Sequence, residues 1–217
     1  MTSRRPSYAE RRARADARLA ERSQIDDPAI VLEAAAAFLS VRPRSVHETR
    51  RRLLRLGYPS GPVGIVIERL LEFGYLDDEA FARAWVESRD RARPRGEMAL
   101  RRELQLKGID RDLITAALAQ RAAADDERDR RANTRGSTSA AETGATVESA
   151  DEGAARRLLV RRRASLARET DLRRRRQKAY ALLARSGFAP DVCARVSAES
   201  VAAPDEHEAF GAAAEGV

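Results

Sequence analysis

Cysteine, histidine and aromatic residues are scarce in this chain. Its 217 residues contain one cysteine, Cys193, two histidines and only 5% aromatic side chains. A single cysteine cannot form an intrachain disulfide or a cysteine-based zinc site. Neither His47 nor His207 has a partner at metal-ligand spacing, and no serine or cysteine nucleophile has a recognisable base. We therefore expect no enzymatic activity, no cofactor and no metal site.

Long hydrophobic runs are also missing. No apolar stretch is long enough to span a bilayer, and the first residues are polar and basic, unlike a secretory signal. The sequence predicts a cytoplasmic protein that does not associate with membranes.

Positive charge is present in excess. Lysine and arginine number 41 against 34 acidic residues, which gives a net charge of +7, and the only lysines are Lys107 and Lys178. Such a balance suits nucleic acid or an acidic protein surface as partner. A chain rich in arginine and alanine can equally reflect genomic base composition, so the charge alone does not choose between these explanations.

A repeated pattern surrounds three glycines, Gly57, Gly108 and Gly187. In each repeat a leucine stands four residues before the glycine, and a bulky apolar residue follows it. This pattern predicts a helix that ends on a left-handed glycine, a short turn and a second helix. A further amphipathic helix precedes each pair, at 29–41, 78–91 and 154–167. The sequence thus predicts an all-α fold of three tandem three-helix repeats.

The repeats divide the chain into six parts. The internal stretch 122–153 contains almost no large apolar side chain, so burial cannot offset the entropy lost on ordering it. The first residues are polar and basic without a core-forming face, and the last stretch has acids but no lysine or arginine. The expected parts are a basic flexible arm (1–28), module 1 (29–76), module 2 (77–121), a disordered linker or insertion (122–153), module 3 (154–199) and an acidic disordered tail (200–217).

An adjacent acid pair, Asp77 and Asp78, could suggest a metal or catalytic site. The pair stands where the first helix of module 2 begins, so we interpret it as a helix cap that accepts free backbone N–H groups. In module 1, Ser45 and Glu48 match a capping box. Pro62 is expected at the first position of the helix that follows the glycine turn.

Basic side chains concentrate on the middle helix of each module. Leu53 and Leu56, and then Leu100 and Leu104, mark the buried sides of the first two, so their charged neighbours should point outward. Repeated along stacked modules, these side chains would form an extended cationic surface, although a merely solvated face is the alternative. The candidate partner-binding residues are Arg51, Arg52, Arg55, Arg101, Arg102, Arg173, Arg174 and Lys178.

Four segments resemble the RecX family of bacterial proteins that regulate the recombinase RecA. They are "RPRSVHE" (42–48) before "RRLLRLGY", "LLEFGYLDDEAFARAWVESR" (70–89), "RRELQLKGID" (101–110) and "LLARSGF" (182–188). The resemblance implies an elongated, curved arrangement of the three repeats. It also implies binding in the groove of the RecA–DNA filament, inhibition of ATP hydrolysis and strand exchange, and a role in DNA repair. Thr49 departs from the family pattern, which usually has leucine there, as does the long insertion before module 3.

RecA and its filament on DNA are therefore the expected partners, with DNA phosphates as an additional contact and a monomer as the expected state. Two other functions stay open. One is a helical protein that binds DNA non-specifically and acts without RecA. The other is a helical-repeat scaffold for a different acidic partner.

Overall fold

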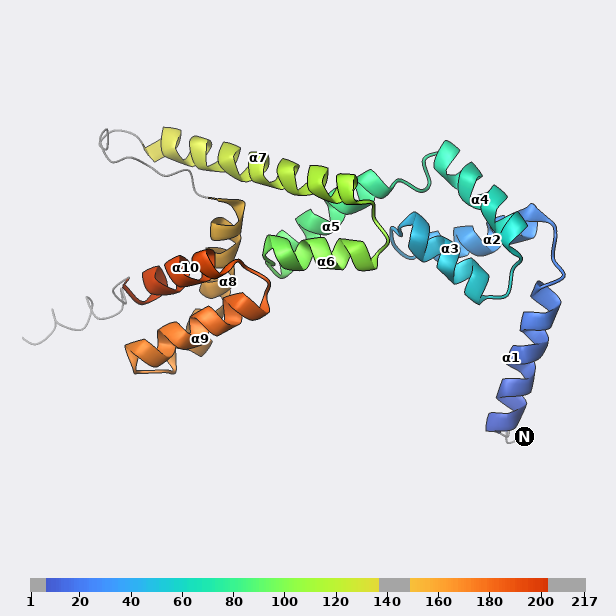
Figure 1. The fold of residues 1–217 in the computed structure, drawn as a ribbon, viewed down its shortest axis with the longest axis horizontal. Coiled ribbons are helices and arrows are strands. Elements are labelled where there is room, and N and C mark those ends of the chain that lie inside the picture. Colours follow the sequence, from blue (N-terminus) through green and yellow to red (C-terminus); the bar gives the residue numbers. More distant parts are fainter. Residues whose placement is uncertain (1–6, 137–148, 203–217) are drawn as a thin grey trace, which may run out of the picture. The chain divides into compact units, whose positions relative to one another are not determined.

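A computed structural model describes residues 7–136 and 149–202, and this part of the chain contains helices and no strands (Figure 1). The predicted all-α class is confirmed. The contacts divide the chain into two compact units, Met1–Ala84 with Leu104–Ile114 and Trp85–Glu103 with Thr115–Val217. The helices are α1 (Tyr8–Arg22), α2 (Pro28–Leu39), α3 (Val46–Arg55), α4 (Ser60–Glu72), α5 (Asp78–Ala92), α6 (Glu97–Leu106), α7 (Arg111–Gly136), α8 (Ala150–Ala167), α9 (Leu172–Arg185) and α10 (Pro190–Ala202).

Module 1 consists of α2, α3 and α4, which pack around a shared core. Val31 and Ala35 of α2, Leu53 of α3 and Ile67 of α4 are each 0% exposed. The predicted capping box at the start of α3 is confirmed, because Ser45 Oγ accepts the N–H of Glu48 and the Glu48 carboxylate accepts the N–H of Ser45. The predicted position of Pro62 is wrong: α4 begins two residues earlier, at Ser60, and Pro62 is buried.

The three turn glycines adopt the predicted left-handed conformation. Their φ angles are 101° at Gly57, 74° at Gly108 and 82° at Gly187. In each turn the N–H of the following residue donates to the carbonyl of the leucine four residues before the glycine, at 3.1–3.3 Å. These following residues, Tyr58, Ile109 and Phe188, are 8%, 5% and 1% exposed. The apolar residue after each glycine therefore packs inward, as the repeat pattern predicts.

The two acids at the start of α5 have different partners. Asp77 is the predicted helix cap, since its Oδ1 accepts the N–H of Ala80 at 2.9 Å. Asp78 instead accepts the N–H of Val46, the first residue of α3, at 2.9 Å. Burial raises the pKa of the Asp78 carboxyl, against the opposing effect of this hydrogen bond. The sequence interpretation is thus confirmed for Asp77 and wrong for Asp78, which caps a helix of the preceding module.

Module 3 has a core of its own. Ala154 and Ala155 of α8, Leu183 of α9 and Cys193 of α10 are each 0% exposed and belong to one cluster. The α9–α10 turn contributes Phe188 to the same cluster. The loosest of the three repeats in sequence therefore still forms a packed three-helix module.

Two helices extend into stretches that were expected to be a flexible arm and a disordered insertion. Helix α1 lies within 1–28; Ser7 and Glu10 form a capping box at its start, and none of its residues is buried. Helix α7 continues past 121 to Gly136, and α8 begins at Ala150, before the expected end of the insertion. Residues 1–6, 137–148 and 203–217 lie outside the described part, so the expectations for the acidic tail, including His207, are not addressed by it.

Candidate partner-binding surface

The α3 helix presents its arginines to solvent. Thr49 and Leu53 are each 0% exposed and define its buried side. The buried Thr49 hydroxyl donates to the Ser45 carbonyl at 3.0 Å, which explains how a polar residue is accommodated at this core position. Arg50, Arg51, Arg52 and Arg55 are all exposed, and we call them the α3 arginine surface. The structure confirms the prediction that Arg51, Arg52 and Arg55 point outward.

A hollow of about 360 Å³ adjoins this surface. Because α3 supplies three arginines to one wall, a phosphate or carboxylate entering the hollow would meet several guanidinium groups at once. An adjoining shallow depression is lined by His47, Arg50, Arg51, Leu54 and Arg55. The residues that line the hollow are Phe38, His47, Glu48, Arg51, Arg52, Arg55, Leu106 and Lys107.

One carboxylate lies within the hollow and is already paired. Lys107 Nζ contacts Glu48 Oε1 at 2.6 Å, and the Arg42 guanidinium lies 3.4 Å from the same oxygen. Burial disfavours the Glu48 carboxylate, but the hydrogen bond and charge of Lys107, together with the Ser45 N–H and the charge of Arg42, hold the pKa below its usual range. Glu48 therefore stays ionised and paired with Lys107. The α3 arginines are then the charged groups that an anion entering the hollow would contact.

An aromatic ring supports the same wall. The guanidinium of Arg44 lies 4.2 Å from the centroid of the Phe38 ring, and that of Arg52 lies 5.8 Å from it. These distances are within the range of cation–π attraction. Burial lowers the pKa of Arg44, with a contribution from the charge of Arg42. The ring thus holds two arginines close together despite their like charges.

The other predicted residues lie on two further helices. Arg101 of α6 is half-buried and pairs with Glu97 at 2.9 Å, while Arg102 is exposed. On α9, Lys178 forms an ion pair with Glu169, and Arg174 lies 4.0 Å from Asp171. Arg173 is exposed at the start of the same helix. The structure therefore brings Arg51, Arg52 and Arg55 together, whereas several of the others are paired with acids of their own modules.

A larger apolar groove of about 960 Å³ lies on module 1 as well. Its walls come from α2, from residues 40–43 and from the end of α4. Three of its apolar side chains, Val41, Phe73 and Tyr75, are 75%, 63% and 73% exposed. Arg42 and Arg69 are its charged lining residues. Apolar exposure of this extent is typical of a surface that contacts protein.

Several residues of the hollow were missed by sequence reasoning. His47, Phe38 and Lys107 come from the start of α3, from α2 and from the turn after α6. Lys107 lies 59 residues from its partner Glu48. No local sequence pattern could have predicted that Lys107 and Glu48 pair. The location of His47 could have been predicted, because it lies beside Ser45 at the predicted start of a helix.

The described ranges contain no group of three or more potential metal-ligating side chains. Within the same ranges, none of the helices is both long and apolar enough to cross a membrane.

Two protein-family models match the first two modules. Residues 32–70 match the model of the first three-helix domain of RecX, and residues 77–118 match the model of its second three-helix domain. Modules 1 and 2 are similar to the first two domains of RecX. The resemblance found in the sequence is thereby confirmed, and the two matched ranges fall within the predicted modules.

The curated relatives that match these modules are named as regulatory proteins. The regulatory protein RecX of Mycolicibacterium smegmatis is 43% identical over 81 residues, which cover 37% of this chain and 43% of the relative. The regulatory protein RecX of Prosthecochloris aestuarii is 38% identical over 89 residues, 41% of this chain and 59% of the relative. The chain thus matches about half of the length of the curated relatives.

Solved structures of RecX share the fold. One crystal structure of regulatory protein RecX aligns with a TM-score of 0.58 at 20% identity and covers 91% of this chain and 81% of the other. RecX from Lactobacillus salivarius aligns with a TM-score of 0.56 at 19% identity, covering 81% of this chain and 97% of the other. At these identities the comparison supports the helical fold, and it does not assign a role to any residue of this chain.

Proposed function

We propose that this chain regulates a RecA-type recombinase by binding its filament on DNA, and that it inhibits ATP hydrolysis and strand exchange. The observation that carries the proposal is the α3 arginine surface on a module that matches the first domain of RecX. A RecA–DNA filament offers both carboxylates and phosphates to such a surface. Because guanidinium groups bind both bidentately, the same arginines suit either part of the filament.

The apolar groove favours a protein-coated filament over bare DNA. Phosphate oxygens are bound by cationic side chains and by hydrogen-bond donors, and apolar side chains such as Val41 and Phe73 offer them neither. Exposed aromatic residues instead act as anchors in protein interfaces. A module that carries both an arginine surface and an apolar groove therefore suits a partner with protein and phosphate surfaces, which supports the filament as the partner.

The deciding experiment measures RecA's ATP hydrolysis on single-stranded DNA, with RecA from the same organism and this protein added well below RecA's concentration. We expect hydrolysis to fall at substoichiometric levels, because one molecule bound in a filament affects many subunits. Hydrolysis that is unchanged up to equimolar protein would contradict the proposal and leave the repeats as a scaffold for another partner.

The arginine surface is tested by the triple variant Arg51→Glu, Arg52→Glu, Arg55→Glu. We expect it to lose most inhibition while its circular dichroism stays helical, because all three side chains are exposed. A matched control reverses three exposed arginines elsewhere, Arg14, Arg18 and Arg162, and so changes the net charge equally. An equal loss of inhibition in the two variants would show that only the total charge of the protein matters.

The DNA-only alternative is examined with the same proteins. A non-specific DNA-binding protein would bind bare DNA at the concentrations that inhibit, with an affinity that falls steeply as salt rises. We expect bare-DNA binding to be weaker than filament binding at the same ionic strength. The opposite order would favour the alternative.

A further inference from the structure

Tyr75, shortly after the end of α4, is exposed although the turn before it resembles the three repeat turns. Gly74 is left-handed, with a φ of 71°, and the N–H of Tyr75 donates to the Leu70 carbonyl at 2.9 Å, the same bond that closes each repeat turn. In the repeat turns the residue after the glycine is buried. Here Tyr75 is 73% exposed, and the next residue, Leu76, is buried instead at 2%. Packing within module 1 therefore does not account for an aromatic side chain at this position.

Tyr75 lines the apolar groove of module 1 together with Phe73 and Val41, which are also exposed. Leu70 is part of the same lining, is only 4% exposed and belongs to the core of the module. The surface of the groove is therefore continuous with the core. A groove of about 960 Å³ has room for several side chains. Apolar side chains that enter it would remove this surface from water, which favours binding.

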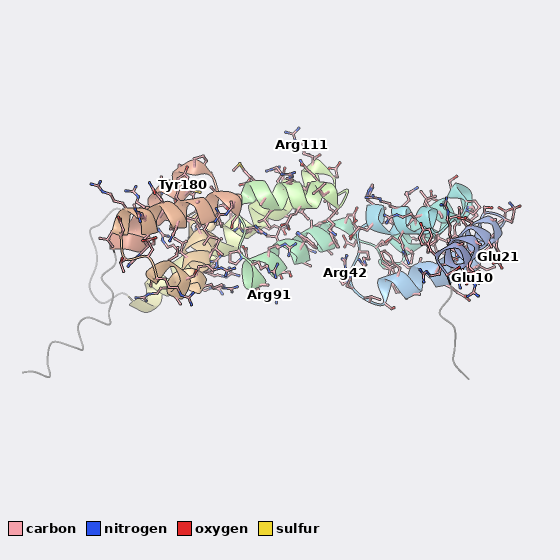
Figure 2. The ribbon with its side chains drawn as sticks, turned by 90° about the horizontal axis from the view of Figure 1, so that it is seen from below. Glu10, Glu21, Arg42, Arg91, Arg111 and Tyr180 are labelled. Atoms are coloured by element: carbon pink, nitrogen blue, oxygen red, sulfur yellow. The ribbon has the colours of Figure 1, made fainter. Side chains whose placement is uncertain are left out.

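The charged residues that line the groove are both arginines, Arg42 and Arg69. Arg42 lies in the connection between α2 and α3 (Figure 2). Its guanidinium is 3.4 Å from Glu48, whose nearer partner is Lys107 at 2.6 Å, so Arg42 can turn to another carboxylate at little loss. The guanidinium of Arg69 lies 5.8 Å from the centroid of the Phe73 ring, and among the described residues it forms no ion pair. The groove therefore matches an occupant that carries carboxylates beside its apolar side chains.

A helix suits this groove better than an extended segment. Residues 29–76 are all described and form helices and no strand, so module 1 has no sheet edge to which an extended segment could add a strand. The Ser40 hydroxyl in the lining already donates to the Ala37 carbonyl at 3.0 Å. A helix satisfies its own backbone groups and can contact the groove through side chains three and four residues apart. The matching occupant is therefore an amphipathic helix with acidic residues.

The groove lies next to the hollow of the α3 arginine surface. Phe38 and Leu39 are neighbours on α2, and the first lines the hollow while the second lines the groove. Arg42 lines the groove and contacts Glu48, which lines the hollow. A single partner seated in the groove can therefore also reach the α3 arginine surface.

We propose that the groove binds an amphipathic helix of the recombinase that carries carboxylates. Its apolar side chains pack on Val41, Phe73 and Tyr75, and one of its carboxylates pairs with Arg69. This inference takes the recombinase as partner from the proposed function, and it adds the site and the kind of segment that binds there. The two surfaces of module 1 then differ in their response to salt. Charge attraction at the α3 arginine surface weakens as salt rises, whereas apolar burial in the groove does not.

The site is tested by photo-crosslinking from position 75. Tyr75 is replaced by p-benzoylphenylalanine, the full-length protein is irradiated on RecA filaments assembled on single-stranded DNA, and the linked peptide is identified by mass spectrometry. We expect a RecA peptide from a helix, with apolar residues three or four apart and an aspartate or glutamate within one turn of them. The control carries the same photoreactive residue in place of Ile65, which is 54% exposed on α4 and does not line the groove.

The linked molecule decides between the alternative occupants. Linkage to DNA, to a second copy of this chain, or to vesicles of anionic phospholipid added to the same reaction would overturn the proposal. A RecA peptide without the apolar spacing or without a carboxylate would overturn it as well. So would linkage from position 75 that is no stronger than linkage from position 65.

The double variant Phe73→Ser, Tyr75→Ser measures what the groove contributes to inhibition. We expect the concentration that halves RecA's ATP hydrolysis to rise roughly tenfold, as for the loss of a central interface anchor, and the charge reversal Arg69→Glu to raise it as well. The control, Ile65→Ser with Val160→Ser, removes two exposed apolar side chains outside the groove and should leave inhibition unchanged. Unchanged inhibition in the groove variants would rule out the groove as a binding site and leave the proposed function standing. An unmodified chain that does not inhibit would instead contradict the proposed function and, with it, this choice of partner.

Discussion

Glu48 is a single side chain that joins two modules. Its carboxylate caps α3 through the Ser45 N–H and pairs with Lys107 at 2.6 Å, and 18% of the side chain is exposed. We expect Glu48→Gln to lower the free energy of unfolding by about 1–2 kcal/mol at neutral pH, because glutamine keeps an acceptor and loses the charge. The measurement is urea denaturation of both proteins.

The pH dependence of that difference follows from the pKa of Glu48. The folded-state pKa is lowered, so the charge stabilises the protein above the unfolded value of about 4.3. This contribution is lost as the pH falls through the folded-state pKa. The two proteins should therefore differ at pH 7 and converge in acid. A difference that stays constant down to acid pH would show that the charge of Glu48 is not the cause.

Individual residues differ in how far the sequence predicts them. The capping box of α3 and the left-handed glycines were predictable, because each depends on residues three to five apart. Asp78 and Lys107 were not, because their partners Val46 and Glu48 lie 32 and 59 residues away. The outward direction of Arg51, Arg52 and Arg55 followed from helical periodicity around Leu53. The neutralisation of Arg101 and Lys178 by Glu97 and Glu169 depends on rotamers that periodicity does not specify.

Helices α1 and α7 show why the sequence underestimated helical length. The absence of large apolar residues indicated disorder. Yet α7 carries ion pairs at helical spacing, Asp126 with Arg130 at 3.9 Å and Glu127 with Arg131 at 3.0 Å. Such pairs stabilise a solvated helix by about 0.2–0.5 kcal/mol each. A helix can therefore continue past the core when charge spacing and alanine content favour it.

One buried arginine anchors α7 within its unit. Arg121 is 8% exposed, binds both oxygens of Asp90 at 3.0 and 3.1 Å, and binds Asp151 at 2.7 Å. We expect Arg121→Ala to cost about 3–5 kcal/mol, because two mostly buried carboxylates, each with 16% of its side chain exposed, would lose their counter-charge. Arg131→Ala on the same helix removes an exposed pair and should cost less than about 0.5 kcal/mol. Thermal unfolding of both variants measures the contrast, and equal stability would mean that water replaces Arg121 at little cost.

The modules unfold cooperatively only if the contacts between neighbouring modules are stable. Stability in a repeat protein is approximately the sum of the modules and the contacts between neighbours. Trp85, the only tryptophan, donates to Glu103 at 2.9 Å and so reports on α5 and α6. Far-UV circular dichroism reports on all helices. In the unmodified chain we expect both signals to change over the same range of denaturant.

Gly187→Ala should separate the two signals. The substitution introduces a side chain at a φ of +82°, where it would overlap Ala99, so it strains the glycine turn of module 3 and its contact with α6. We expect the circular dichroism to decrease at lower urea than the Trp85 fluorescence, because module 3 would unfold before α5 and α6. Gly64→Ala is the control, since a methyl group there meets no atom within 4 Å and replaces a helical glycine, which should raise stability by about 0.5–1 kcal/mol. If the two signals still coincide in Gly187→Ala, the modules fold as one cooperative block whatever the state of this contact.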